Sequence, residues 1–233
     1  MPKNGVPIKR LALEVLAIFL GVTAGFLADD YRDYLNDRRR EREILQQLLE
    51  DLALDSADIA PLIPLSANRA RAMLWLNNSA SQPNPSVDSW SAVLNGMRSG
   101  MFFTYEPSAH TYSALKASGD LGLIRDRQLR DTIVYYYEDR QPVLEDNNWG
   151  AVNAEIRWRE ELAPYVEPQP ATSLYRYPEV HVTDPNGLFA DPTLRNASVL
   201  LGSWYSFQES NARSMRATNA SLKAAIRAKL VRW

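Results

Sequence analysis

The side chains with the chemistry for catalysis or metal binding are few and scattered along this sequence. The 233 residues include no cysteine and two histidines, His110 and His181, which excludes disulfides, thiolate nucleophiles and zinc–thiolate sites. No nucleophile stands at a recognisable spacing from His110, so a structural role beside its neighbouring tyrosines is favoured over general-base catalysis. Residues 184–187 faintly resemble a calcium loop but lack the later ligands, and Pro185 instead indicates an ordinary turn.

Sequence signatures of known catalytic and cofactor sites are absent. The chain has no Walker A, dinucleotide-binding, nucleophile-elbow or zinc-protease motif. Its formal net charge is −2, which argues against a nucleic-acid partner bound through bulk charge. We therefore expect no catalytic, cofactor-binding or metal-binding residues, and no enzyme activity.

The carboxylate with the most unusual setting is Glu14, because it lies inside the apolar run 11–28 (LALEVLAIFLGVTAGFLA). A helix of this length is at the lower limit for crossing a hydrocarbon core of ~30 Å. Its Leu, Ile, Val and Phe side chains favour insertion by roughly 4 kcal/mol, which outweighs one acid near a helix end. We predict a transmembrane helix. A cleaved signal peptide is the alternative, but the run is long for one and no clean Ala-x-Ala cleavage site follows.

Small residues recur every four positions along this predicted span. Ala17, Gly21 and Gly25 form a small-xxx-small stripe, which lets two helix backbones approach closely. Glu14 precedes Gly21 by seven residues and so lies on the same face. The pattern predicts a helix–helix interface in the membrane made of these four residues. The alternative is a plain anchor whose Glu14 reaches the headgroups, and a proton pathway would need more than one carboxylate.

The helical pattern continues after the span. Residues 29–59 contain no Gly or Pro, and apolar residues recur at helical spacing from residue 44, so we predict a stalk helix that ends before Pro61. The arginine run 38–40 is interleaved with acids, which indicates a solvated, salt-bridged face rather than a nucleic-acid patch. The Lys/Arg count on the two sides of the span leaves the orientation open. A short tail before a long domain favours a periplasmic domain.

Two segments of the sequence carry a family resemblance. The matching residues are Glu14, Leu16, Ile18, Leu20, Gly21 and Val22 in the span, Asp29, Asp30 and Tyr31 with the Arg/Glu run after it, and the stretch YSALKASGDL (112–121) with Ile124, Leu129, Arg130, Tyr136 and Tyr137. They resemble a group of uncharacterised bacterial membrane proteins, classed as domains of unknown function. The resemblance covers about residues 9–140 and implies membrane location and a helical domain. It brings no established activity and no catalytic residues.

The rest of the chain is predicted to form an α-helical soluble domain. Expected helices cover residues 66–79, 88–98, 108–118 (with Ser108 as N-cap and Gly119 as C-cap), 126–141, 144–162, and a final long helix from Asp191 or Thr193 to Trp233. Pro142 is expected to end or kink its helix. The proline-rich segment 164–192 is expected to lack regular structure, and packing against the domain is favoured over a ligand site there.

The end of the final helix is basic. Arg227, Lys229 and Arg232 precede Trp233, and these cations suit the negative end of the helix dipole. If this helix runs antiparallel to the stalk, the same four residues would return to the membrane surface and contact anionic headgroups.

The sequence thus predicts an all-α, single-pass protein of a bacterial inner membrane. It would consist of a basic tail (1–10), a transmembrane helix (11–28), a stalk helix (29–59) and a helical-bundle-like soluble domain (60–233), which we expect to be periplasmic. The expected partners are the lipid bilayer and either further copies of the chain or a larger membrane complex with this chain as accessory subunit; nucleic acid is not expected. The alternative is a membrane-tethered ligand-binding or sensor module that uses segment 164–192.

Overall fold

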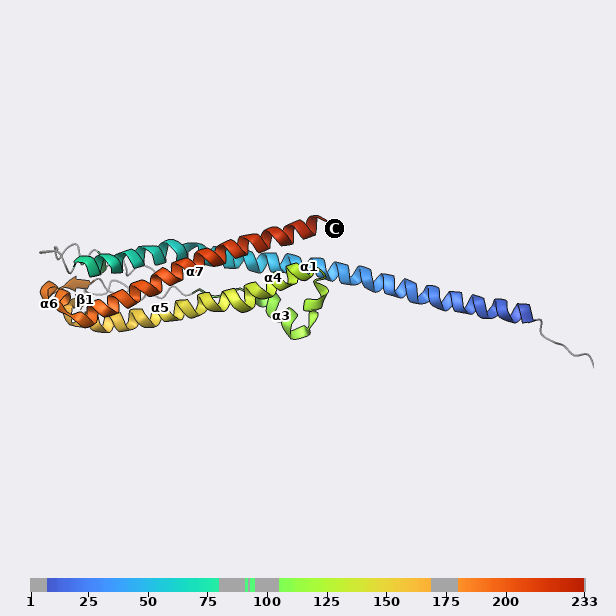
Figure 1. Cartoon of the computed structure of the whole chain (residues 1–233), viewed down its shortest axis with the longest axis horizontal. Helices are drawn as coiled ribbons and strands as arrows, with labels where there is room; N and C mark the ends of the chain where they lie inside the picture. The colour runs from blue at the N-terminus through green and yellow to red at the C-terminus, as the bar shows by residue number, and fades with distance from the viewer. Residues whose placement is uncertain (1–7, 80–90, 92, 95–104, 169–179, 233) are drawn as a thin grey trace, which may run out of the picture.

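The computed structural model of the chain is an elongated helical molecule, with one helix projecting far beyond the others (Figure 1). It describes residues 8–79, 91, 93–94, 105–168 and 180–232. The expected all-α fold with a long N-terminal helix is confirmed. The predicted helix 88–98 lies mostly outside the described residues.

The described helices follow one another with short connections. They are α1 (Ile8–Ser79), α3 (His110–Ser118), α4 (Arg127–Tyr135), α5 (Gln141–Leu162), α6 (Pro185–Ala190) and α7 (Pro192–Val231), with short turns η1 (Asp120–Leu123), η2 (Tyr136–Arg140) and η3 (Ala163–Tyr165). Strand β1 (Val166–Pro168) pairs antiparallel with β2 (Val180–Val182), with Val166 opposite Val182.

Helix α1 is one continuous helix of 72 residues. The predicted end of the stalk at residue 59 is wrong, because α1 continues through Pro61 and Pro64. Each proline removes one backbone donor and crowds the carbonyl four residues earlier, but both rings are exposed on the solvent side of the helix. The opposite face is held by buried apolar side chains, namely Ile59, Leu62 and Ile63.

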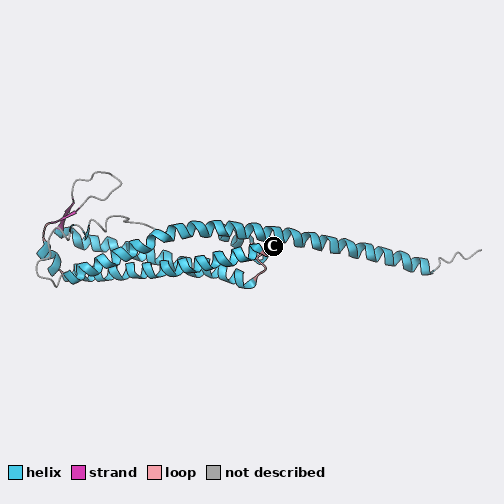
Figure 2. Ribbon diagram, turned by 90° about the horizontal axis from the view of Figure 1, so that it is seen from above, coloured by secondary structure: helices cyan, strands magenta, loops and turns pink. Residues whose placement is uncertain are grey.

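The bundle is formed by α1 from residue 41 onward, α5 and α7, with α3 and α4 at one end (Figure 2). Helix α7 packs along both α1 and α5. It runs antiparallel to α1, because the amide of Asn219 donates to the carbonyl of Leu52 at 2.9 Å while Gln208 pairs with Ser66. The antiparallel course predicted for the final helix is therefore what the structure shows.

A polar layer divides the apolar core of the bundle into two clusters. The hydroxyl of Ser66 donates to Gln208 at 2.7 Å, and the amide of Gln208 donates to Asn148 at 2.9 Å. All three side chains are buried. In α1, α5 and α7 alike, the layer residue falls between the residues of one cluster and those of the other. These bonds form only when the three helices are level, so the layer favours one axial register.

Helices α4 and α5 are joined by the π-helical turn η2. The backbone N–H of Gln141 donates to the carbonyl of Tyr136, five residues earlier, so one extra residue is accommodated just before Pro142. The expectation that Pro142 ends its helix is wrong, and the distortion takes the form of this turn. Tyr136 and Tyr137 are both buried, although consecutive residues in an α-helix point 100° apart.

The proline-rich segment 164–192 has more regular structure than predicted. Pro185 is the first residue of α6 rather than part of an ordinary turn, and Asp184 caps this helix by accepting from the N–H of Gly187 at 2.9 Å. Val182 and Leu188 are buried in the second core cluster. The described part of the segment packs on the bundle, as favoured from the sequence; Tyr175 and Tyr177 lie outside the described residues.

The two helix ends marked by local sequence signals are confirmed. Gly119 ends α3 in the left-handed conformation, with φ of 79°, which glycine adopts without strain. Asp191 caps α7 by accepting from the N–H groups of Thr193 and Leu194. The helix then runs through Gly202 without a break as far as Val231.

Candidate functional site

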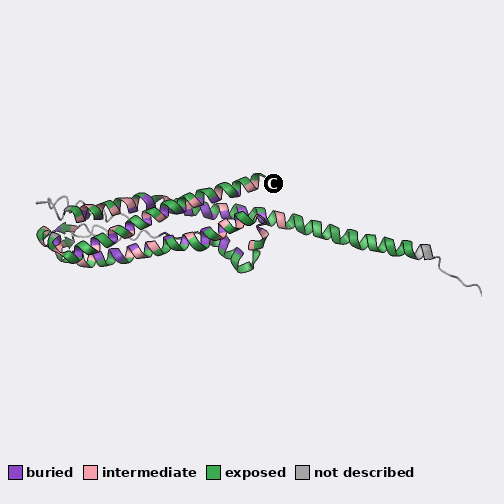
Figure 3. Ribbon diagram, viewed as in Figure 1, coloured by how far each residue is buried: buried purple, intermediate pink, exposed green. Residues whose placement is uncertain are grey.

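Residues 12–36 of α1 form an exposed arm that no other described part of the chain covers (Figure 3). The large apolar side chains in the first part of the arm are 53% to 68% exposed; they are Leu13, Val15, Leu16, Ile18, Phe19, Leu20, Val22, Phe26 and Leu27. Among the described helices, α1 is the one long and apolar enough to cross a membrane, and none of its most apolar window is buried.

The four residues of the predicted interface lie on this arm. Glu14, Ala17, Gly21 and Gly25 are all exposed, and they lie on one face of the continuous helix. A Cβ atom added at Gly21 or Gly25 would meet nothing within 4 Å. The structure places the four residues as the spacing predicted, and their role as an interface stays a prediction.

The arm joins the bundle where α1 contacts Arg125, the residue that precedes α4 by two positions. The Arg125 guanidinium lies 4.4 Å from the centre of the Tyr34 ring and 3.6 Å from the carboxylate of Asp37. Glu41, which is 1% exposed, accepts from the backbone N–H of Arg125 at 3.2 Å. These contacts clasp α1 at one level, so the arm leaves the bundle in a fixed direction.

The most heavily bonded buried carboxylate is Asp55, in the bundle part of α1. Its Oδ1 accepts from the backbone N–H of Ser108 at 2.7 Å. Its Oδ2 accepts from the hydroxyl of Tyr136 at 2.8 Å and from the amide of Gln141 at 2.7 Å. Asn219 of α7 donates to the same tyrosine hydroxyl at 2.9 Å. Burial raises the pKa of Asp55, and these hydrogen bonds oppose the rise.

Asp51, one turn earlier, accepts from the backbone N–H of Thr111 at 2.8 Å. Thr111 is in the first turn of α3, whose free N–H groups attract an acceptor. The predicted cap, Ser108, is wrong: Ala109 is the N-cap residue and provides no side-chain bond. Helix α3 is instead capped by a carboxylate from another helix.

These carboxylates join segments that are distant in sequence. The donors to Asp55 come from the loop before α3, from η2 and from α5, all within the protein. The arrangement is therefore a structural anchor rather than a catalytic centre. The sequence did carry a signal for it, since Asp55 interrupts the apolar stripe between Leu52 and Ile59, and acids at core positions are rare unless paired.

A second buried carboxylate, Glu155, lies near the other end of the bundle. It accepts from the hydroxyl of Tyr205 at 2.7 Å and from the guanidinium of Arg159 at 2.6 Å. Arg69 of α1 approaches it at 3.7 Å and lies over the Tyr205 ring. The interpretation of Arg159 as a partner of solvated acids on the helix surface is wrong, because its partner is buried.

A groove of about 590 Å³ runs along the seam of α1 and α7. On α7 its walls include Val199, Gly202, Ser206 and Phe207, and on α1 they include Ala67, Ala70 and Leu74. Leu74, Val199 and Phe207 are each more than half exposed. Gly202 lets the two helices approach closely, because a Cβ there would lie 3.0 Å from the Cβ of Met73.

The end of α7 lies beside α1 at the arm end of the bundle (Figure 1). Ile226 packs in the same cluster as Leu45. About 17 residues separate Leu45 from Ala28, a rise of about 25 Å, whereas the headgroup layer of one leaflet is about 5–8 Å thick. Contact of Arg227, Lys229 and Arg232 with headgroups thus needs a tilted arm and stays a prediction. Trp233 lies outside the described residues.

The remaining residues with metal-binding chemistry do not gather in the described part of the chain. His110 begins α3 and His181 lies on β2, and both are exposed. Among the described residues, no three His, Asp or Glu side chains are placed to hold one metal ion.

Comparison of the whole chain with known proteins gives no match. No protein-family model, no curated protein and no solved structure matches it. The resemblance to uncharacterised bacterial membrane proteins therefore stays a prediction, and the function has to be argued from the geometry.

Proposed function

We propose that this chain is a membrane-anchored structural or interaction protein. Residues 11–28 would cross a bacterial inner membrane once, and the bundle would stand in the periplasm. The protein would self-associate or serve as an accessory subunit of a membrane complex. One observation carries the proposal: a single rigid helix is fully exposed and apolar over its first part and buried along one face in the rest.

The exposed arm is the part of α1 that needs an apolar environment. Exposed apolar surface costs about 25 cal/mol per Å² relative to burial, and an apolar patch of this extent on a monomer is a site of membrane or protein contact. The bundle buries its own apolar stripe, so it needs no such environment. A bilayer around residues 11–28 supplies what the arm lacks.

Within the membrane, the face that carries Glu14, Ala17, Gly21 and Gly25 would pack against another helix. Small residues on this face allow close backbone contact. A carboxylate on the same face would pair with a donor of the neighbouring helix, because an unpaired charge in the hydrocarbon core is costly. The neighbour would be a second copy of this span or a helix of a membrane complex.

The test is the native mass of the full-length protein, extracted in mild detergent and compared with variants Gly21→Leu and Gly25→Leu. A mass at a small multiple of 26.4 kDa that falls in both variants would support self-association through the span. A larger particle that contains other polypeptides, and loses them in the variants, would support the accessory-subunit form.

Thr23→Leu is the matched control, because Thr23 lies on the opposite face of the span and bonds only to the carbonyl of Phe19 among described contacts. It should leave the native mass unchanged. A monomer in the unmodified protein would refute assembly, and an equal effect of all three variants would refute an interface on the small-residue face.

A further inference from the structure

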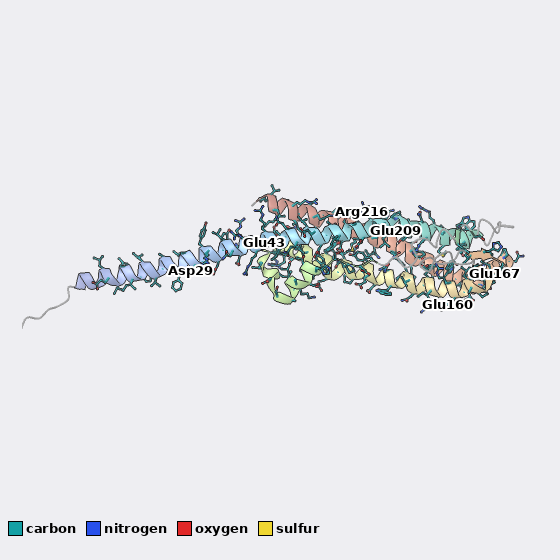
Figure 4. The ribbon with its side chains drawn as sticks, turned by 180° about the vertical axis from the view of Figure 1, so that it is seen from behind. Asp29, Glu43, Glu160, Glu167, Glu209 and Arg216 are labelled. Carbon is teal, nitrogen blue, oxygen red and sulfur yellow. The ribbon has the colours of Figure 1, made fainter. Side chains whose placement is uncertain are left out.

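Helix α7 carries a continuous row of residues spaced alternately three and four apart, which we name the α7 ridge. It consists of Gly202, Ser206, Glu209, Arg213, Arg216, Ala220, Lys223 and Arg227. This spacing keeps all eight residues on one side of a straight helix. The first four also line the α1–α7 groove, so the ridge extends the groove toward the arm end of the bundle. Figure 4 shows Glu209 and Arg216 where α7 runs beside α1.

The two halves of the ridge differ in chemistry. The groove half is floored by small residues and bordered by the exposed apolar side chains Leu74, Val199 and Phe207. The arm half is cationic, and α7 contains no acid after Glu209. A ligand that covers both halves must therefore be apolar at one end and acidic at the other.

The cations of the arm half have no acidic partners among the described residues. Glu209 pairs with Arg213 at 2.8 Å, whereas no ion pair joins Arg216, Lys223 or Arg227 to an acid in the described part of the chain. These three lie close enough to repel one another, since Arg227 and Arg216, after desolvation, hold the pKa of Lys223 below its ordinary value. An acidic partner would relieve that repulsion.

We propose that the seam of α1 and α7 binds an amphipathic helix of a partner protein, whose apolar side fills the groove and whose acidic residues pair with Arg216, Lys223 and Arg227. This rests on the proposed function, because it names the partner surface of a protein that assembles with others. A shallow apolar groove between two helices is a recurrent seat for such a helix. From Val199 to Arg227 the seam is about 40 Å long, which suits an extended helix.

The position of the seam favours a protein over the membrane of the arm itself. Residue 216 lies near the level of Asp55, as Asn219 bonds to the carbonyl of Leu52. That level is about 40 Å along α1 from Ala28, several times the Debye length of about 8 Å at physiological salt. The basic row therefore extends away from the headgroups, and a partner helix can follow it.

The first test uses a synthetic helical peptide with Leu and Ala on one face and Glu on the other, labelled with fluorescein. The full-length protein is held in phosphatidylcholine nanodiscs, and empty nanodiscs are the blank. We expect saturable binding that weakens at high salt, and at least tenfold weaker binding to the variant Arg216→Glu/Lys223→Glu. A peptide with Lys in place of Glu should not bind.

The controls separate the groove from general charge. Arg157→Glu alters an exposed arginine of α5 and should leave binding unchanged, while Ser203→Trp fills the groove and should weaken binding at unchanged circular dichroism and Tm. Equal binding of the acidic and basic peptides, or equal loss in Arg157→Glu and Arg216→Glu/Lys223→Glu, overturns the proposal.

The second test identifies the occupant in membranes of the native host. A photo-crosslinking benzophenone side chain replaces Ser203 or, as the control position, Ile156 of α5. The proposal expects a heterologous polypeptide joined at Ser203 alone, through a segment with helical apolar spacing and excess Asp and Glu. A product of twice 26.4 kDa, a lipid adduct or no product overturns it.

These outcomes are independent of the span. If Gly21→Leu lowers the native mass while Arg216→Glu/Lys223→Glu changes neither mass nor peptide binding, the proposed function stands and the seam proposal fails. If the unmodified protein is a monomer that nevertheless binds the acidic peptide, the assembly proposed for the span fails while the seam retains its ligand.

Discussion

The two parts of α1 share one backbone and differ in what covers them. In the arm, residues 12–36 are exposed on every side. In the bundle, Leu45, Leu48 and Leu52 are completely buried on one face while the opposite face is polar. An apolar stripe that meets a stripe of the same chain builds a core, and apolar residues around the whole circumference require a different solvent.

Buried acids sharpen the same contrast. Glu41, Asp51 and Asp55 are buried in the bundle part and accept hydrogen bonds from segments far along the chain. Glu14 in the arm is exposed. The bundle part thus finds its polar partners within the chain, and we propose that the arm finds them in the membrane.

The largest expected effect comes from placing an arginine in each part of α1. Leu48→Arg buries an unpaired charge at a site that is 0% exposed, and we expect a loss of more than about 4 kcal/mol in the free energy of unfolding. Leu16→Arg should leave the unfolding of the bundle unchanged and weaken membrane insertion by about 3 kcal/mol. Denaturant titration measures the first effect and carbonate extraction the second.

The two readouts must separate for the comparison to hold. If Leu16→Arg lowers the Tm of the bundle as much as Leu48→Arg does, the arm packs on the bundle. If Leu16→Arg leaves the protein fully in the membrane, the span is elsewhere or tolerates the charge at its position.

Removing the buried carboxylate of Asp55 should have the next largest effect. Asp55→Ala leaves three buried donors without an acceptor, and we expect a loss of about 3–5 kcal/mol in the free energy of unfolding. Asp58→Ala is the control, because Asp58 is exposed one turn further along α1, and it should change stability by less than about 0.5 kcal/mol. Equal effects of the two variants in urea titration would contradict a structural role for Asp55.

Glycines test how closely each part of the protein is packed. A Cβ at Gly150 of α5 would lie 2.4 Å from the ring of Trp204, so Gly150→Ala should destabilise the bundle by about 1–3 kcal/mol. Gly21→Ala has open space around it and should cost the bundle nothing. Thermal unfolding of both variants checks this, and a stabilised Gly150→Ala protein would show that Trp204 can move aside.

The smallest expected effect is on pH dependence. Because burial raises the folded-state pKa of Asp55, the folded protein takes up this proton at a higher pH than the unfolded chain. The contribution of Asp55 to stability therefore increases as pH falls from 7 toward 4. The Tm of the unmodified protein minus that of Asp55→Asn should rise over this range.

The difference between the two proteins is the quantity to follow, because other carboxylates act in the opposite direction. The pKa of Glu138 is lowered by its bonds from Lys116 and Tyr112, and that of Asp191 by its bond from Tyr165. Both groups lose stabilisation as pH falls, equally in the two proteins. A flat or falling difference would show that Asp55 is not the group that titrates.

Local signals predicted much of the fold. The apolar run 11–28, the left-handed Gly119 that ends α3, and Asp191 that begins α7 each depend on neighbours within a turn or two. The Asp55 anchor and the capping of α3 by Asp51 were not predicted, because their partners lie 53 or more residues away. The groove was missed for the same reason.

The sequence by itself therefore determined that the chain is helical, where it is apolar enough to enter a membrane, and where two of its helices end, since hydrogen bonding and apolar spacing within a helix are local. Only the tertiary structure decided that α1 continues through Pro61 and Pro64, and that α7 presents a groove and a basic ridge beside α1. Those outcomes depend on which helix faces are brought together, and packing between distant segments can outweigh a local preference such as that of proline to end a helix.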